Sequence, residues 1–247
     1  MQTVVAMPKF AANLSFLFAD APFPERFRRA AAAGFAGVEY LFPYDYPASG
    51  VAGWLRANDL EQVLFNLPAG DWAAGERGLA CLPQRQGEFA ESVERALDYA
   101  AALDCRRVHC MAGRRPAGVG EAELEPTYVA NLRFAADRFA TIGATVTIEP
   151  INSRIDMPGY WLDDVAKGFR LLEAVGRGNV KLQYDIYHAQ IIADDLARTL
   201  EANIGRIGHI QIADNPGRHE PGSGEINYPF LFDLLDRLGY DGWSAAS

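Results

Sequence analysis

The chain has 247 residues, of which 49% are hydrophobic, and 32 acidic against 23 basic residues give it a formal net charge of −9. Its length is close to the roughly 250 residues of an eight-stranded α/β barrel, so we expect a single domain over residues 1–247. The negative charge argues against a nucleic-acid backbone or an anionic membrane as the main partner, because both recruit basic patches, and it leaves a small ligand or a bound cation.

The N-terminal stretch lacks the features of a secretory signal, because Asn13, Ser15 and Asp20 interrupt its apolar residues. No run of about 20 apolar residues occurs elsewhere. The three cysteines are an odd and sparse set, which is typical of reduced thiols rather than of a disulfide framework. We therefore expect a cytoplasmic protein.

Seven short apolar stretches are predicted to be strands, and each carries a polar residue near its carboxyl end. In chain order they are FAANLSF with Asn13, GVEYLF with Glu39, VLFNLP with Asn66, RVHCMA with His109, TVTIEP with Glu149, KLQYDIY with Asp185 and HIQIAD with Gln211. Helical patterns follow them at 24–34, 51–59, 87–104, 125–143, 161–176, 193–205 and 228–239. The repeated strand-then-helix order predicts a parallel sheet closed into a (β/α)₈ TIM barrel.

An open, doubly wound sheet is the alternative fold. It favours a glycine-rich phosphate turn after the first strand, and the segment NLSFLFADAPFP has no glycine. In a barrel the carboxyl ends of all strands meet at one mouth, where active sites of this architecture are built. Burying an unpaired polar group costs about 1–3 kcal/mol, so the polar strand ends predict a shared partner, namely a metal ion and a small polar substrate.

Three of these strand ends are predicted metal ligands. Glu149, Asp185 and Gln211 end successive strands and offer oxygen ligands at comparable depth. Carboxylate and amide oxygens with no cysteine favour a hard divalent ion such as Mg²⁺ or Mn²⁺. Two carboxylates at one depth repel each other unless a cation or a shared proton lies between them. A buried, hydrogen-bonded carboxylate without a metal is the alternative for any one of them.

Five further residues are predicted to contact the substrate. His188 follows the sixth strand, and Arg218 lies in the rim segment NPGRHEPGSGEINY. The planar guanidinium of Arg218 suits two-pronged binding of a substrate carboxylate. Glu39, Asn66 and His109 would line the opposite half of the mouth, where substrate contact and polar filling of the core both remain open.

These residues lie in segments that resemble the hydroxypyruvate isomerase family, within the xylose-isomerase-like barrel superfamily. The most specific segments are ANLSFLF, GFAGVEYLFPYDYP, LFNLPAGDW, YDIYHAQ and GRHEPGSGEINYPFLFDLLDRLGYDGW. The resemblance implies a (β/α)₈ barrel that isomerises hydroxypyruvate to tartronate semialdehyde through an enediolate. It also implies that Glu149 is a metal ligand and the general acid/base, and that Asp185 and Gln211 are metal ligands. By similarity to related sugar epimerases, His188 and Arg218 would hold substrate oxygens.

The chain departs from this family's pattern at its C-terminal end. The family's eighth strand continues to a second catalytic glutamate four residues past the tryptophan of a Gly-Trp pair, and Ser247 stands at that position here. The helix expected after that strand is missing too. We expect truncation in the eighth βα unit; the alternatives are a partner subunit of a homo-oligomer that supplies the group, or a natural variant that binds without turnover.

Three other functions remain open. An isomerase of four-carbon 2-oxo-tetronate, or a related sugar epimerase, needs the same chemistry in a pocket of another length. An apurinic-site endonuclease shares the barrel, but it needs a cluster of several metal ligands and a basic DNA-facing surface, which the net charge opposes. A sugar-acid binding protein without catalysis would follow from the absent glutamate.

Overall fold

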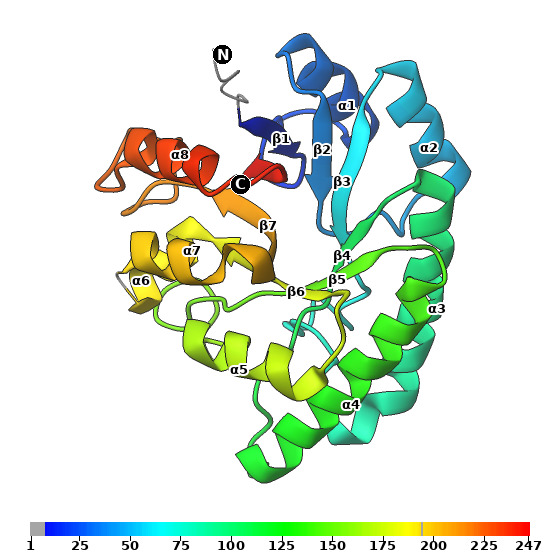
Figure 1. Cartoon of the computed structure of the whole chain (residues 1–247). Helices are drawn as coiled ribbons and strands as arrows, with labels where there is room; N and C mark the ends of the chain where they lie inside the picture. Colours follow the sequence, from blue (N-terminus) through cyan, green and yellow to red (C-terminus); the bar gives the residue numbers. More distant parts are fainter. Residues whose placement is uncertain (1–7, 194) are drawn as a thin grey trace.

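The structure is a computed structural model that describes residues 8–193 and 195–247, and it confirms the predicted TIM barrel (Figure 1). Eight parallel strands close in chain order, with β8 pairing with β1. They are β1 (Lys9–Asn13), β2 (Gly37–Tyr40), β3 (Glu61–Asn66), β4 (Arg107–His109), β5 (Thr145–Ile148), β6 (Val180–Asp185), β7 (Ile207–Ile212) and β8 (Trp243–Ala246).

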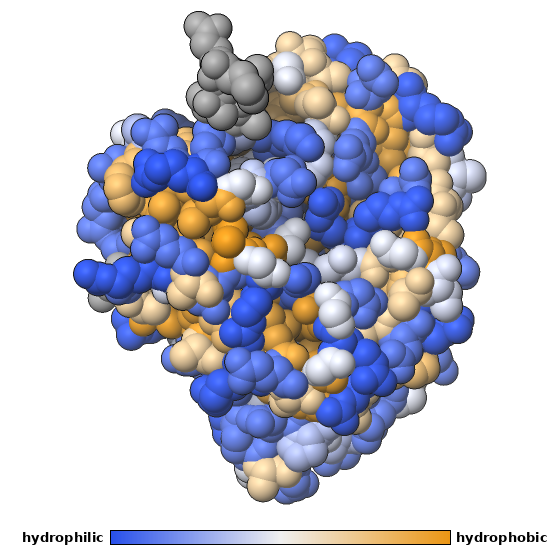
Figure 2. All heavy atoms as spheres, in the orientation of Figure 1, coloured by the Kyte–Doolittle hydropathy of each residue, from blue (hydrophilic) through white to orange (hydrophobic). Residues whose placement is uncertain are grey.

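Helices surround this barrel, and α3 and α4 are the longest of those described. The helices are α1 (Phe23–Ala32), α2 (Ala48–Ala57), α3 (Gln86–Leu103), α4 (Glu121–Ala140), α5 (Val165–Val175), α6 (Ile186–Ala193), α7 (Leu196–Asn203) and α8 (Tyr228–Arg237), with short 3₁₀ turns η1 (Pro83–Arg85) and η2 (Ile204–Arg206). Figure 2 shows largely hydrophilic residues at the periphery of this face. Among the helices of the described ranges, none is long and apolar enough to cross a membrane.

Helix α6 is the main difference from the sequence prediction, which placed no helix directly after the sixth strand. The Asp185 side chain accepts a hydrogen bond from the backbone N–H of Tyr187 at 2.9 Å, which satisfies a free donor of the first helical turn. The chain therefore turns from β6 into α6 without a loop. His188 lies in the first turn of this helix rather than in a connecting segment.

Strand register explains why the polar strand ends gather in pairs. Asp185 of β6 lies beside Gln211 of β7, and Asn13 of β1 lies beside Glu39 of β2. Asn66 and His109 form the corresponding pair on β3 and β4. Because side chains alternate across each strand, residues at the same level of parallel neighbours point to the same side of the sheet. The barrel thus carries a polar layer at the carboxyl ends of its strands.

The barrel also contains a small apolar cluster that is separate from the main core. It consists of Ala11, Val63, Leu64, Trp243 and Ala245, contributed by β1, β3 and β8. The Trp243 ring packs against the backbone at the start of β2, and its indole N–H donates to Glu61 Oε1 at 3.1 Å. This contact ties β8 to β2 and β3.

A methyl group added at Gly37 should strain this contact. An ideal Cβ there would lie 2.7 Å from Val63 Cγ2 and 2.8 Å from the Trp243 ring. We expect Gly37→Ala to lower the free energy of unfolding by about 1–3 kcal/mol, the usual cost of overpacking. The control is Gly53→Ala in α2, where no atom lies within 4 Å of the new methyl, and it should gain up to about 1 kcal/mol. Urea unfolding measures both, and equal stability of the two variants would contradict the prediction.

Candidate active site

A cavity of about 360 Å³ opens at the carboxyl ends of the strands. Its lining includes seven residues that the sequence singled out: Asn13, Asn66, His109, Glu149, His188, Gln211 and Arg218. Asp185 and Glu39 do not line the cavity themselves. Asp185 lies 3.7 Å from the lining residue His188, and Glu39 accepts a hydrogen bond from the lining residue Gln211. The structure therefore brings the predicted residues to one place. Most of them line the cavity, and Asp185 and Glu39 lie behind the lining residues.

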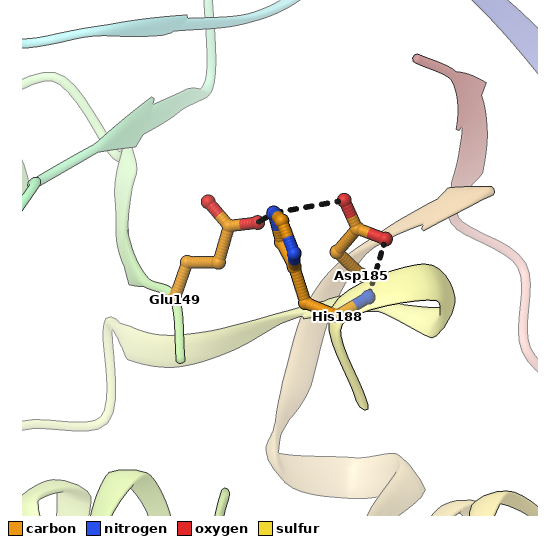
Figure 3. A group of neighbouring side chains, drawn as sticks. All are labelled: Glu149, Asp185 and His188. Carbon is orange, nitrogen blue, oxygen red and sulfur yellow. Dashed lines mark hydrogen bonds and ion pairs between the residues drawn. The ribbon is translucent and has the colours of Figure 1, made fainter. Parts of the chain in front are cut away.

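Two carboxylates and an imidazole form the centre of this site (Figure 3). Glu149, Asp185 and His188 each offer a ligand atom, and these atoms all lie within 4.8 Å of one another. His188 Nε2 lies 3.9 Å from Glu149 Oε1 and 3.7 Å from Asp185 Oδ2. All three side chains are buried, with relative exposures of 5%, 2% and 3%. Such a group combines the donor types that bind divalent ions.

Electrostatics at the centre favours a cation. Burial raises the pKa of Glu149 well above its ordinary value, and the negative charge of nearby Asp185 raises it further. One carboxylate oxygen of Asp185, Oδ2, is buried without a hydrogen-bond partner, although the second oxygen caps α6. An unpaired buried carboxylate oxygen next to a second buried carboxylate is destabilising unless positive charge lies between them. The residues therefore fit a divalent ion held by Glu149 and Asp185.

Gln211, the third predicted ligand, takes part in a hydrogen-bond network. Its Nε2 donates to Glu39 at 2.5 Å, and its Oε1 accepts from Gln183 Nε2 at 2.9 Å. Gln183 Nε2 also donates to Glu149 Oε2 at 3.1 Å. An amide oxygen has two lone pairs, so Gln211 Oε1 retains one acceptor site for a further partner.

Glu39 is fully buried and completely engaged by protein donors. It accepts from Asn13 at 2.8 Å and from Gln211, and it lies 2.6 Å from His209 Nε2. With these contacts Glu39 reaches the cavity through Gln211 rather than directly.

His109 and Asn66 also line the cavity, at the ends of β4 and β3. Asn66 Oδ1 lies 3.3 Å from His109 Nδ1, and His109 Nε2 is 3.6 Å from Glu149 Oε2. Burial lowers the pKa of His109 to about 3, with smaller contributions from the two neighbouring histidines, so His109 is neutral at pH 7. Its buried Nε2 has no hydrogen-bond partner, and neither has Asn66 Nδ2. Both atoms are available to a polar ligand in the cavity.

Arg218 lies over the carboxylates at the mouth. Its guanidinium is 3.6 Å from Asp185 Oδ2 and 3.5 Å from Asp156 Oδ1, and it lies 5.1 Å from the ring centroids of Phe16 and Tyr187. The buried Arg218 Nε has no hydrogen-bond partner. These contacts hold the guanidinium plane in place while leaving a donor free for an anionic group.

The loop that carries Arg218 is organised by one buried carboxylate, Asp214. It accepts backbone N–H hydrogen bonds from Asn215 at 2.9 Å, Gly222 at 2.7 Å and Ile226 at 3.0 Å. Burial alone would raise the pKa of Asp214, but these hydrogen bonds outweigh it and the pKa is lowered. The ionised carboxylate therefore fixes the loop before any ligand binds.

Sequence reasoning missed several residues at the cavity. Arg77 lines it and lies 3.8 Å above the Trp72 ring, and Asp156 lines it beside Arg218. Both lie in long loops, where no periodicity predicts the direction of a side chain. Asn152, which touches His188, lies in such a loop as well. Gln183 was detectable, because alternation places it on the face of β6 that carries Asp185.

Replacing Glu149 by glutamine should stabilise the metal-free protein at neutral pH. Because the folded-state pKa of Glu149 is raised, its ionised form opposes folding, and this penalty is absent below about pH 4 and grows as the pH rises toward the folded-state value. We expect Glu149→Gln to gain about 1–4 kcal/mol in EDTA at pH 7. In thermal melts, the rise in melting temperature on addition of Mg²⁺ should be smaller for Glu149→Gln than for the wild type.

The control for this experiment is Glu201→Gln on the exposed side of α7. It should change neither the stability in EDTA nor the stabilisation by Mg²⁺. A Glu149→Gln protein that is less stable than the wild type in EDTA would show that the ionised carboxylate is compensated without a metal.

Comparisons with known proteins identify the family of this chain. The family model described as xylose isomerase-like TIM barrel matches residues 27–246. The 2-oxo-tetronate isomerase of Cupriavidus necator is 52% identical over 237 residues, which cover 96% of this chain and 91% of the relative. The hydroxypyruvate isomerase of Escherichia coli K12 is 47% identical over 237 residues, or 96% and 92% of the two chains.

A crystal structure from Brucella melitensis, named AP endonuclease, family 2, superposes with a TM-score of 0.95 at 51% identity and covers 97% of this chain and 92% of that one. The match to the family model spans most of the chain, and the identity to the curated relatives extends over nearly all of it. This chain therefore belongs to the xylose isomerase-like TIM barrel family.

Proposed function

We propose that this enzyme is an isomerase of a small hydroxy-oxo acid and that its substrate is hydroxypyruvate, which it interconverts with tartronate semialdehyde. The observation that carries the proposal is the buried group of Glu149, Asp185 and His188 facing a cavity with Arg218 at its mouth. The relative from Escherichia coli, which is a hydroxypyruvate isomerase at 47% identity, supports the choice of substrate.

Glu149 would move the proton. Its carboxylate takes a proton from C3 of hydroxypyruvate, and the C–H electron pair becomes the C2=C3 double bond of an enediolate while O2 takes up the negative charge. The proton of the O3 hydroxyl then passes to O2 while the same carboxyl group returns its proton to C2, so that O2 becomes a hydroxyl group and C3 becomes the aldehyde carbon. A positioned carboxyl group can release and take up a proton in turn; burial raises the pKa of Glu149, and a cation bound to it would lower that pKa again.

The neighbouring residues would bind and orient the substrate. Arg218 holds the substrate carboxylate through its guanidinium. His188 and His109 both line the cavity, each near one oxygen of Glu149, and can bind the two substrate oxygens next to the carbons between which the proton moves. A divalent cation held by Glu149 and Asp185, with Gln211 nearby, would supply positive charge that stabilises the enediolate. Mg²⁺ or Mn²⁺ suits the oxygen-rich donor set.

A four-carbon substrate is the second candidate. The relative from Cupriavidus necator is a 2-oxo-tetronate isomerase, and at 52% it is slightly more similar to this chain than the hydroxypyruvate isomerase is. A cavity of about 360 Å³ has room for a three-carbon or a four-carbon acid together with water. Both substrates would use the same carboxylates and the same arginine. They would differ only in the contacts that the end of the substrate away from Arg218 makes with the cavity.

The endonuclease name of the Brucella melitensis structure identifies a third possibility to test. An endonuclease of this fold would need a cluster of several metal ligands, whereas residues 8–193 and 195–247 contain one group of three potential metal ligands. The chain carries a formal net charge of −9, whereas binding to a DNA backbone depends on basic residues. Incubation with a duplex that contains an abasic site should therefore leave the DNA uncut.

Isomerase assays should show Glu149 to be essential. The Mg²⁺-loaded protein should interconvert hydroxypyruvate and tartronate semialdehyde, and Glu149→Gln should lower kcat by about 10²–10⁴-fold, the usual contribution of a positioned acid/base. The exposed substitution Glu201→Gln should leave kcat unchanged. Comparing kcat/KM for hydroxypyruvate and for 2-oxo-tetronate decides between the two substrates. Absence of turnover on both acids, with Mg²⁺ and with Mn²⁺, would refute the proposed function.

Arg218→Lys should weaken substrate binding while leaving metal binding intact. Lysine keeps the charge, but it loses the planar, two-pronged geometry that matches a carboxylate. We expect KM to rise about tenfold or more, while the Mg²⁺ titration followed by thermal melting stays at the wild-type value. Arg198→Lys, on the exposed side of α7, is the matched control. An unchanged KM in Arg218→Lys would mean that another group, such as Arg77, holds the carboxylate.

A further inference from the structure

The side chain of Asn152 lies between the loop after β5 and the imidazole of His188. It is fully buried, and its Nδ2 lies 2.8 Å from His188 Nδ1. The same Nδ2 donates to Asp156 Oδ2 at 2.5 Å. Its Oδ1 accepts from the backbone N–H groups of Ile155 at 2.9 Å and of Asp156 at 3.2 Å. Both donor positions and both acceptor positions of the amide are therefore occupied.

These four contacts allow only one orientation of the amide. In the opposite orientation, Nδ2 would face two backbone N–H donors, and Oδ1 would face the Asp156 carboxylate. Each of those contacts would set a donor against a donor or an acceptor against an acceptor inside a buried volume, where no water can replace the lost partner. Asn152 thus presents an N–H group, and not an oxygen, to His188.

A nitrogen that accepts an N–H hydrogen bond carries no proton of its own. His188 Nδ1 is therefore the acceptor, and the neutral ring carries its proton on Nε2. This Nε2 faces Glu149 and Asp185 at 3.9 and 3.7 Å, which is too long for a hydrogen bond to either carboxylate. His188 also lines the cavity, and Figure 3 shows its ring between the two carboxylates. Its Nε2–H is a donor aimed at the position of a ligand.

We propose that Asn152 is a positioning residue that holds His188 in the Nε2-protonated tautomer, so that His188 donates a hydrogen bond to a substrate oxygen instead of binding the metal ion. The role of the donated hydrogen bond rests on the proposed isomerase function, whereas the tautomer does not. Charge that develops on O2 in the enediolate strengthens a hydrogen bond from a fixed donor, and this is how such a donor accelerates the reaction. The predicted division between metal ligands and substrate contacts then follows from a single asparagine.

Nuclear magnetic resonance tests the tautomer directly. The chain contains four histidines, so a long-range ¹H–¹⁵N correlation of protein labelled with ¹⁵N-histidine is simple, and His188→Gln identifies the signals of His188. We expect Nε2 of His188 to carry the proton in the metal-free protein and to keep it when Mg²⁺ is added. A proton on Nδ1, or loss of the Nε2 proton on addition of Mg²⁺, would overturn the proposal whether or not the protein is an isomerase.

Asn152→Asp tests the positioning role. An aspartate oxygen accepts hydrogen bonds and cannot donate to Nδ1, so the proton of His188 should move to Nδ1, and kcat should fall about 10–100-fold with a smaller change in KM. Ser153→Ala is the matched control, because it removes a hydrogen bond to Asp163 from the same loop without touching His188. An Asn152→Asp protein with the wild-type tautomer and kcat would overturn the role of Asn152. Should that variant fail to fold, the wild-type spectrum still decides the tautomer.

Discussion

The site is organised by the burial of two carboxylates at the ends of neighbouring strands. Glu149 follows β5 and Asp185 ends β6, and the barrel buries both side chains. In a medium of low dielectric, two such charges repel strongly, and each loses its hydration. The surrounding groups reduce this conflict in part, since Gln183 donates to Glu149, and Arg218 lies 3.6 Å from Asp185. A bound cation, or a proton on Glu149, would remove most of what remains.

A directed hydrogen-bond network fixes the side chains below these carboxylates. The carboxylate of Glu39 can only accept, so it turns the Nε2 of Gln211 toward itself and leaves the Gln211 oxygen to accept from Gln183. Gln183 then accepts from Thr147 and donates its second proton to Glu149. Every member has a defined donor and acceptor end, and reversing one amide would break the hydrogen bonds on both sides of it. The position of Glu149 therefore depends on Glu39, although Glu39 does not line the cavity.

The sequence predicted the features that repeat and missed those that occur once. The alternation of short apolar stretches with helical patterns predicted the barrel, because this order recurs seven times along the chain and the same packing rule imposes it each time. Polar residues at strand ends identified Glu149, Asp185 and Gln211 as one group, since parallel register brings equivalent positions together. Helix α6 was missed because its cap, Asp185, is also the last residue of β6. Asn152 and Asp156 were missed because loop geometry depends on individual hydrogen bonds.

The barrel and its loops contribute different residues to the site. Glu149, Asp185 and Gln211 lie on or next to strands, where register and the polar network fix them, so the proton-transfer chemistry changes little when a loop changes. Arg218, by contrast, lies on a rim loop whose conformation depends on Asp214, and Arg77 on another that carries Trp72. These loop side chains form the walls that a longer substrate would meet first. The side chains at the rim of the cavity therefore depend on loop conformation, whereas the carboxylate pair depends on the strands.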